Sequence, residues 1–170
     1  VSAPQSVKVV AATNVVLNDS ENELGNLDIT AGNKVIIREN DADAVNGIVK
    51  AKSLQVQVTA GIELTTVVSS IAASSDTNKI QISNTGALAV DDYSTDADLP
   101  LNGVELKSGT AATGKIDIKT KSPITVNAPI TNSGEGQIIL AALGNAATDD
   151  VTVNSSITGD DLAIYAGDSI

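Results

Sequence analysis

The chain has 170 residues and a formal net charge of −11, from 10 basic and 21 acidic side chains. It contains no Cys, His, Met, Trp or Phe, and only two Tyr. These absences exclude zinc fingers, iron–sulfur clusters and catalysis that depends on His or Cys. The acidic excess argues against nucleic acid as a partner, because phosphate backbones repel negative charge. The apolar runs are too short for a membrane-spanning helix, so we expect no membrane insertion.

The composition favours β-strands. Hydrophobic residues make up 42% of the chain, and nearly all of them are Val, Ile, Leu and Ala. β-Branched side chains prefer pleated strands, whereas Asn, Asp, Ser, Thr and Gly favour turns. We therefore predict one all-β domain over residues 1–170, which forms a segment of a longer repeat protein.

One pattern recurs along the chain: alternating apolar residues, a small turn residue, and alternation again. Residues Val7–Leu17 resemble a degenerate first copy. Six clearer copies follow, at residues 25–37, 53–64, 79–90, 115–126, 137–153 and 161–170. Within each copy the alternation points side chains in and out by turns. Ile36 interrupts the polar face that the alternation otherwise predicts.

The copies are spaced almost regularly. Four of the five gaps between their first apolar residues are about 25 residues long. In a β-sandwich each strand has different neighbours, so a constant spacing has no physical cause. In a parallel β-solenoid equivalent positions stack, and a constant spacing results. We predict an all-β parallel β-solenoid with about three short strands and about 25 residues per turn. An immunoglobulin-like or cadherin-like sandwich is the alternative.

The solenoid predicts columns of inward apolar side chains, because each turn buries its neighbour's equivalent residues. Each copy contributes two inward residues: its first apolar residue and the residue two positions later. The expected inward residues are Leu27, Ile29, Leu54, Val56, Ile80, Ile82, Ile116, Ile118, Ile138, Leu140, Leu162 and Ile164.

The longest gap, between Ile80 and Ile116, contains an acidic stretch. We predict that residues 91–101 form an inserted loop, because Asp, Ser, Thr and Pro favour loops over strands. Its carboxylates suit calcium, which takes oxygen ligands in flexible turns. The candidate ligands are Asp91, Asp92, Asp96 and Asp98. Solvated turn acids are the favoured interpretation here and at the acidic pairs 41/43, 149/150 and 160/161, since the spacing matches no EF-hand or Gly-rich calcium repeat.

Two phrases carry a family resemblance: KSPITVNAPIT at residues 121–131 and DVTVNSSIT at residues 150–158. Together with Ala-Gly turns such as 31–32 and 60–61, they resemble the repeats of filamentous-haemagglutinin-like secreted proteins. These are giant Gram-negative surface proteins with right-handed parallel β-helices of three-stranded turns. The resemblance covers most of residues 25–170, and it implies a right-handed solenoid and a location outside or on the surface of a bacterial cell.

These patterns predict a structural and adhesive shaft segment of a large extracellular bacterial surface protein. The expected partners are adjacent repeats or copies of itself along the axis, and a host or cell-surface glycan or protein. We expect no enzymatic activity and no cofactor, with calcium as the only candidate ion. One alternative is a calcium- or glycan-binding extracellular module, and another is a carbohydrate-active enzyme with a carboxylate pair. Only Tyr93 and Tyr165 offer rings for sugar stacking, and Arg38 is the only Arg, which disfavours the enzyme.

Overall fold

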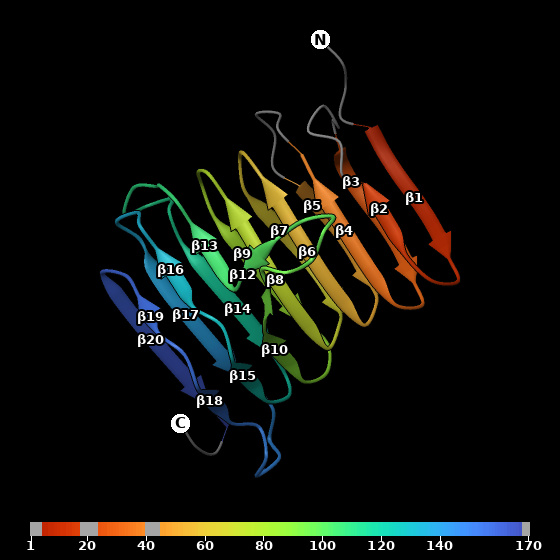
Figure 1. Ribbon diagram of the computed structural model, residues 1–170. Helices are drawn as coiled ribbons and strands as arrows, with labels where there is room; N and C mark the ends of the chain where they lie inside the picture. The colour runs from red at the N-terminus through yellow and green to blue at the C-terminus, as the bar shows by residue number, and fades with distance from the viewer. Residues whose placement is uncertain (1–4, 18–23, 40–44, 168–170) are drawn as a thin grey trace.

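The computed structural model describes residues 5–17, 24–39 and 45–167, and every regular element within them is a β-strand. The strands stack in parallel into a β-solenoid of about 7 turns, with about 20 residues per turn (Figure 1). The predicted fold class is therefore confirmed. Within these three ranges there is no helix long and apolar enough to cross a membrane.

One wall of the solenoid, sheet A, contains eight parallel strands in an unbroken order. Each strand hydrogen-bonds the equivalent strand of the next turn, so the backbone groups of inner turns are paired along the axis. The strands are β1 (Gln5–Ala11), β3 (Leu24–Ala31), β5 (Val45–Lys50), β7 (Ile62–Val67), β9 (Ile80–Asn84), β14 (Ile116–Thr120), β17 (Gln137–Ala142) and β20 (Asp161–Ala166).

The other wall, sheet B, begins with one strand per turn and then divides. Its first four strands are β2 (Val15–Leu17), β4 (Lys34–Arg38), β6 (Ser53–Val58) and β8 (Ser70–Ser75). The start of β8 pairs with one short strand and its end with another. Sheet B then continues as two columns of short strands. One is β10 (Leu88–Val90), β15 (Ile124–Val126) and β18 (Val151–Val153), and the other is β13 (Val104–Leu106), β16 (Ile130–Asn132) and β19 (Ile157–Thr158).

The core consists of inward columns in which each side chain lies on its equivalent in the next turn. In sheet A, for example, Ile80 pairs with Ile116 and Ile116 with Ile138, and all three are fully buried. Ten of the twelve predicted inward residues are buried, which supports the alternation. The two others, Leu162 and Ile164, belong to β20, above which the described residues place no further turn.

Three details of the predicted turn were wrong. Leu54 and Val56 are inward, but they lie on β6 of sheet B in line with Val35 and Ile37, not in sheet A with Leu27. A turn therefore has about 20 residues instead of about 25. Three strands per turn occur only from β9 onward, because earlier turns have an undivided strand in sheet B. The two walls share the same alternation, so the pattern alone does not assign a strand to its wall.

A buried asparagine closes one corner of the solenoid. The Asn84 side-chain oxygen accepts hydrogen bonds from the Thr66 hydroxyl (2.8 Å) and the Val68 N–H (3.0 Å). Its side-chain amide donates to the carbonyl oxygens of Val68 (3.1 Å) and Gly86 (3.0 Å). Three of these bonds satisfy backbone groups at the corner and the fourth satisfies a hydroxyl, and Asn84 itself is buried.

Candidate functional site

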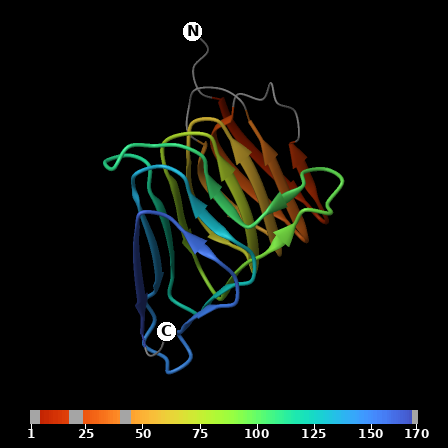
Figure 2. The ribbon, with the colours of Figure 1, turned by 60° about the vertical axis from the view of Figure 1, so that its left-hand side comes forward.

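Residues 91–103 leave the wall between β10 and β13 and fold back over the outer face of sheet B; we call this segment the strap (Figure 2). It contains two short antiparallel strands, β11 (Asp92–Tyr93) and β12 (Leu101–Asn102). The Gly103 N–H donates to the Asp91 carbonyl oxygen (3.2 Å) and closes the base of the strap. Gly103 has a φ of 73°, and a Cβ there would run into the Pro129 carbonyl oxygen, so the base requires glycine.

The underside of the strap is apolar. Leu99 and Leu101 form a small buried cluster with Ile36 and Ala72, which point outward from sheet B, and Tyr93 packs against this cluster. This contact explains why Ile36 interrupts the polar face: its outward side chain is fully buried beneath the strap.

Polar contacts attach the strap to consecutive turns. The Gln55 side-chain amide on β6 donates to the Leu99 carbonyl oxygen at 2.7 Å, in a buried position. The Tyr93 hydroxyl and the Ser70 hydroxyl on β8 are 2.6 Å apart. Together with the contact at Ile36 on β4, these bonds make the strap span three turns of sheet B.

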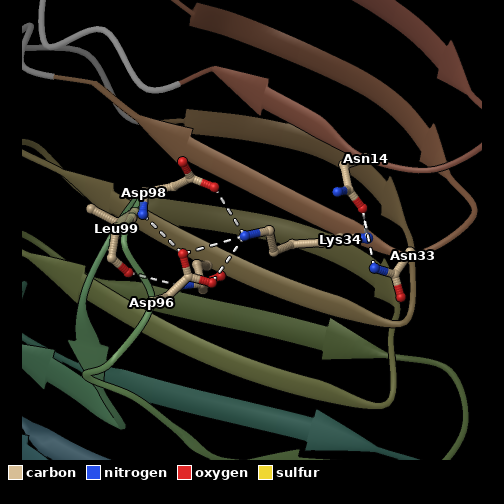
Figure 3. Close-up of polar contacts among 7 residues, drawn as sticks. Asn14, Asn33, Lys34, Asp96, Asp98 and Leu99 are labelled. Carbon is tan, nitrogen blue, oxygen red and sulfur yellow. Dashed lines mark hydrogen bonds and ion pairs between the residues drawn. The ribbon is translucent and has the colours of Figure 1, made fainter.

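A lysine from β4 forms ion pairs with both carboxylates at the tip of the strap (Figure 3). The Lys34 Nζ lies 2.9 Å from Asp96 Oδ2 and 3.1 Å from Asp98 Oδ2. Burial alone would lower the pKa of Lys34, but the hydrogen bonds and charges of the two carboxylates outweigh it and raise the pKa. The Lys34 hydrogen bond lowers the pKa of Asp96, and the Asp98 N–H lowers it further. Both Lys34 and Asp96 have side chains less than one fifth exposed, at 19% and 17%, so solvent screens this pair less than an ordinary surface pair.

The four candidate calcium ligands divide into separate sets of contacts. Asp96 and Asp98 share Lys34, whereas Asp91 accepts a hydrogen bond from the Asn127 side-chain amide (2.9 Å). Asp92 accepts from the Ser94 N–H (2.7 Å), and hydrogen bonds from the Ser94 side chain and backbone lower its pKa. In the part of the chain that the structure describes, no three acidic side chains are grouped so that they could hold a metal ion. Calcium binding stays a prediction.

The other acidic pairs lie elsewhere. Asp41 and Asp43 fall outside the described residues. Asp149 is buried and accepts a hydrogen bond from the Ala146 N–H (2.7 Å) within its own loop. Asp160 directly precedes β20 and Asp161 is its first residue, and both are exposed. Of the two residues considered for sugar stacking, Tyr93 packs against the cluster beneath the strap and Tyr165 is exposed on the outer face of β20.

A second concentration of charge lies where β4, β6 and β8 end. Arg38, Asp76 and Lys107 line an open depression of about 210 Å³. The Lys107 Nζ is 2.8 Å from Asp76 Oδ1, and this hydrogen bond raises the pKa of Lys107. Both partners are nearly half exposed, and exposed pairs of this kind contribute little to stability.

Acid is expected to detach the strap. Asp96 has a lowered pKa in the folded protein, so its ion pair stabilises the closed strap above the ordinary carboxyl pKa of 3.8 and is lost as the pH falls below it. The contribution of Lys34 has the opposite sign. Its raised pKa keeps the pair charged up to and beyond pH 10.5. The ion pair should therefore persist across neutral pH, fail in acid below 3.8, and fail in alkali only above 10.5.

Tyrosine fluorescence measures this detachment, because the chain has two Tyr and no Trp. In a Tyr165→Phe variant, the emission of Tyr93 alone should change as an acid titration from neutral pH proceeds below 3.8, before far-UV circular dichroism reports unfolding of the strands. Lys34→Met in the same background should remove most of this change. An emission that follows the circular dichroism at every pH would contradict a separately detachable strap.

Lys34 also affects the calcium prediction, because its ammonium group occupies the position between Asp96 and Asp98 that a cation would take. Lys34→Met should bind calcium more tightly than the wild type, with a dissociation constant of the millimolar order typical of weak extracellular sites. Isothermal titration of both proteins measures the difference, and Lys34→Met with Asp96→Asn is the matched control. Equal affinity in all three proteins would contradict calcium binding at the tip of the strap.

Sequence patterns identified the acids of this site but not their partners. Lys34, Gln55 and Ser70 contact the strap across a long stretch of sequence, which alternation does not reveal. The one available signal was Ile36, an apolar residue on a face that should be polar. An outward apolar residue on a strand indicates that another segment covers it.

The chain matches no family model, no curated protein and no solved structure.

Proposed function

We propose that the protein is a structural and adhesive shaft segment of a large extracellular bacterial surface protein, of the filamentous-haemagglutinin-like kind. Its work is mechanical: stacked turns extend a rod, and the strap and outer faces are presented to partners. Such partners are adjacent repeats along the axis and a glycan or protein of a host or cell surface. In this proposal the segment has no catalytic role and needs no cofactor.

The observation that carries the proposal is the continuity of the inward columns. Sheet A connects β1 to β20 without a gap, and its inner turns are sealed by buried Val, Ile and Leu. A structure of this kind transmits force through backbone ladders, since each turn is hydrogen-bonded to the turns on either side of it. The charges near the strap also favour this function, because Lys34 pairs with Asp96 and Asp98 instead of leaving the carboxylates open to a substrate.

A shaft segment should tolerate the loss of one complete turn. Deleting residues 115–136 joins Gly114 to Gln137 and removes β14, β15 and β16. Ile138 then replaces Ile116 above Ile80, and Val153 replaces Val126 above Val90, so both of these columns stay apolar. We expect a shorter protein that keeps its β circular dichroism and one cooperative unfolding transition.

The control is a smaller deletion that breaks the turn. Removing residues 115–126 deletes β14 and β15 but keeps β16, so β9 and β17 lose the sheet A strand between them. This variant loses fewer residues than the whole-turn deletion but should fail to fold. If the whole-turn deletion unfolds and the half-turn deletion does not, the shaft interpretation is wrong.

The surface location is tested separately. Antibodies against the strap should label intact cells of the source bacterium as strongly as permeabilised cells. Labelling that requires permeabilisation would contradict an extracellular role, whatever the result of the deletions.

A further inference from the structure

The sequence contains the dipeptide Asn-Gly twice, at residues 46–47 and 102–103. An asparagine that precedes glycine is chemically labile, because glycine has no side chain to hinder attack of its backbone nitrogen on the asparagine side chain. Both copies are flanked by aliphatic residues: Val45 and Ile48, and Leu101 and Val104. A difference in reactivity between the two copies must therefore come from the fold.

The first copy is held inside sheet A. Asn46 and Gly47 belong to β5, which lies between β3 and β7, and both residues are paired with each of these strands. Gly47 packs so closely against β3 that a Cβ there would overlap the Leu27 carbonyl oxygen. A reaction between the two residues would have to pull an inner strand out of its ladder, so the fold protects this copy.

The second copy lies at the base of the strap. Asn102 is exposed, ends the two-residue strand β12, and pairs there with Asp92 alone. The Gly103 N–H donates to the Asp91 carbonyl oxygen at 3.2 Å, which is the bond that closes the base. The attacking nitrogen of this copy is therefore held by a contact within the strap and not by an inner strand of a wall.

We propose that Asn102 is a site of spontaneous deamidation and that closure of the strap controls its rate. The Gly103 nitrogen gives its proton to a base in solution and attacks the side-chain carbonyl carbon of Asn102. The new C–N bond closes a succinimide ring, and the side-chain nitrogen takes a proton from water and leaves as ammonia. Water then opens the ring at either carbonyl, which leaves aspartate or isoaspartate at position 102. This property goes beyond the shaft function and does not depend on it.

The closed strap opposes the reaction through the contacts of Gly103. Its nitrogen cannot attack while the N–H is bonded to Asp91, and its carbonyl oxygen accepts the Ala73 N–H of β8 at 2.9 Å. The labile glycine cannot be exchanged for a less reactive residue, because a Cβ would overlap the Pro129 carbonyl oxygen. The fold therefore requires the reactive dipeptide at the base and slows its reaction by closing the strap over it.

The product changes the base of the strap. Deamidation places a negative charge at position 102 directly opposite Asp92, and like charges on facing strand residues are destabilising. Isoaspartate also lengthens the backbone, so the Gly103 N–H no longer meets the Asp91 carbonyl oxygen in the same register. We expect chains that have reacted to hold the strap less firmly than fresh chains.

Peptide mass spectrometry after storage of the folded protein in mildly alkaline buffer measures the reaction at each asparagine. We expect conversion at Asn102 and little at Asn46. The matched control is storage in guanidinium chloride, where both copies are unfolded and should convert at similar rates. Conversion of Asn46 as fast as Asn102 in the folded protein, or none at Asn102, would overturn the inference.

Lys34→Met tests the control by the strap, because it removes the ion pairs at the tip without touching the reacting residues. It should speed conversion at Asn102 by about two- to fivefold, in line with the modest contribution of a partly exposed ion pair. Conversion at Asn46 should not change. Equal rates at Asn102 in Lys34→Met and the wild type would show that the strap does not control the reaction.

Tyr93 emission in the Tyr165→Phe background reports whether the reaction loosens the strap. After storage, the emission at neutral pH should move toward that of the acid-treated protein. Asn102→Gln is the control, because its longer side chain closes a ring far more slowly and its emission should stay unchanged. An equal change in both proteins would overturn the link between deamidation and strap opening. The whole-turn deletion tests the shaft function separately, so neither result decides the other.

Discussion

Replacing Ile116 with alanine is expected to lower the free energy of unfolding by about 2–5 kcal/mol. Ile116 is fully buried in the middle of a sheet A column, between Ile80 and Ile138. The solenoid cannot collapse around the missing methyl groups, because the backbone ladders fix the spacing of the turns at about 4.8 Å. Chemical denaturation followed by far-UV circular dichroism measures the loss.

The same column supplies the control. Leu162 is the equivalent residue of the last described turn and is 50% exposed. Leu162→Ala should therefore cost less than about 1 kcal/mol, since half of the side chain already contacts water. Similar losses at Ile116 and Leu162 would mean that the columns do not carry the stability of the fold.

Replacing Asn84 with alanine is expected to cost about 2–4 kcal/mol, from the polar groups that it leaves unpaired. The buried Val68 N–H and C=O would each lose their side-chain partner, and the Thr66 hydroxyl would lose its acceptor. The Gly86 carbonyl oxygen would keep one bond, from the Thr120 hydroxyl at 2.7 Å. Denaturation again gives the loss, and amide exchange of the Val68 N–H locates it at the corner.

Asn127→Ala is the matched control for this second substitution. Asn127 also makes side-chain hydrogen bonds, to Asp91 and Asn154, but it is exposed on the outer corner. Water replaces its partners there, so its loss should change the unfolding free energy by no more than about 0.5 kcal/mol. An Asn84→Ala protein as stable as Asn127→Ala would show that the buried amide is not needed to close the corner.

The sequence predicted the fold class because the inward columns leave a local trace. Residues such as Leu27, Ile29 and Ile82 alternate with polar neighbours within a few positions, and all three are buried. The wall to which a strand belongs leaves no such trace. Leu54 has the same pattern as Leu27 although it lies in sheet B, and this ambiguity lengthened the predicted turn.

The candidate site was predictable only in part. The acids Asp96 and Asp98 stood out by composition, but their partner Lys34 lies more than 60 positions earlier, at a sequence separation of 62 from Asp96. Which residue pairs with the strap at so large a sequence separation depends on how many turns the strap crosses. An alternation pattern of a few residues carries no information about that number. Ile36 was the only local sign that a cover existed, and it did not identify the cover.

The range of the strap contacts has a consequence for the order of folding. Neighbouring turns contact each other across about 20 residues, so a solenoid grows by adding turns to those already formed. The strap joins Asp98 to Lys34 across 64 residues. Its Leu99 and Tyr93 contact β6 and β8, and its underside covers Ile36 on β4, so these three strands must already be aligned side by side. It can close only after those three turns have stacked in register. A slipped turn would offer the strap no matching surface, so we expect strap closure to stabilise only the correctly stacked turns.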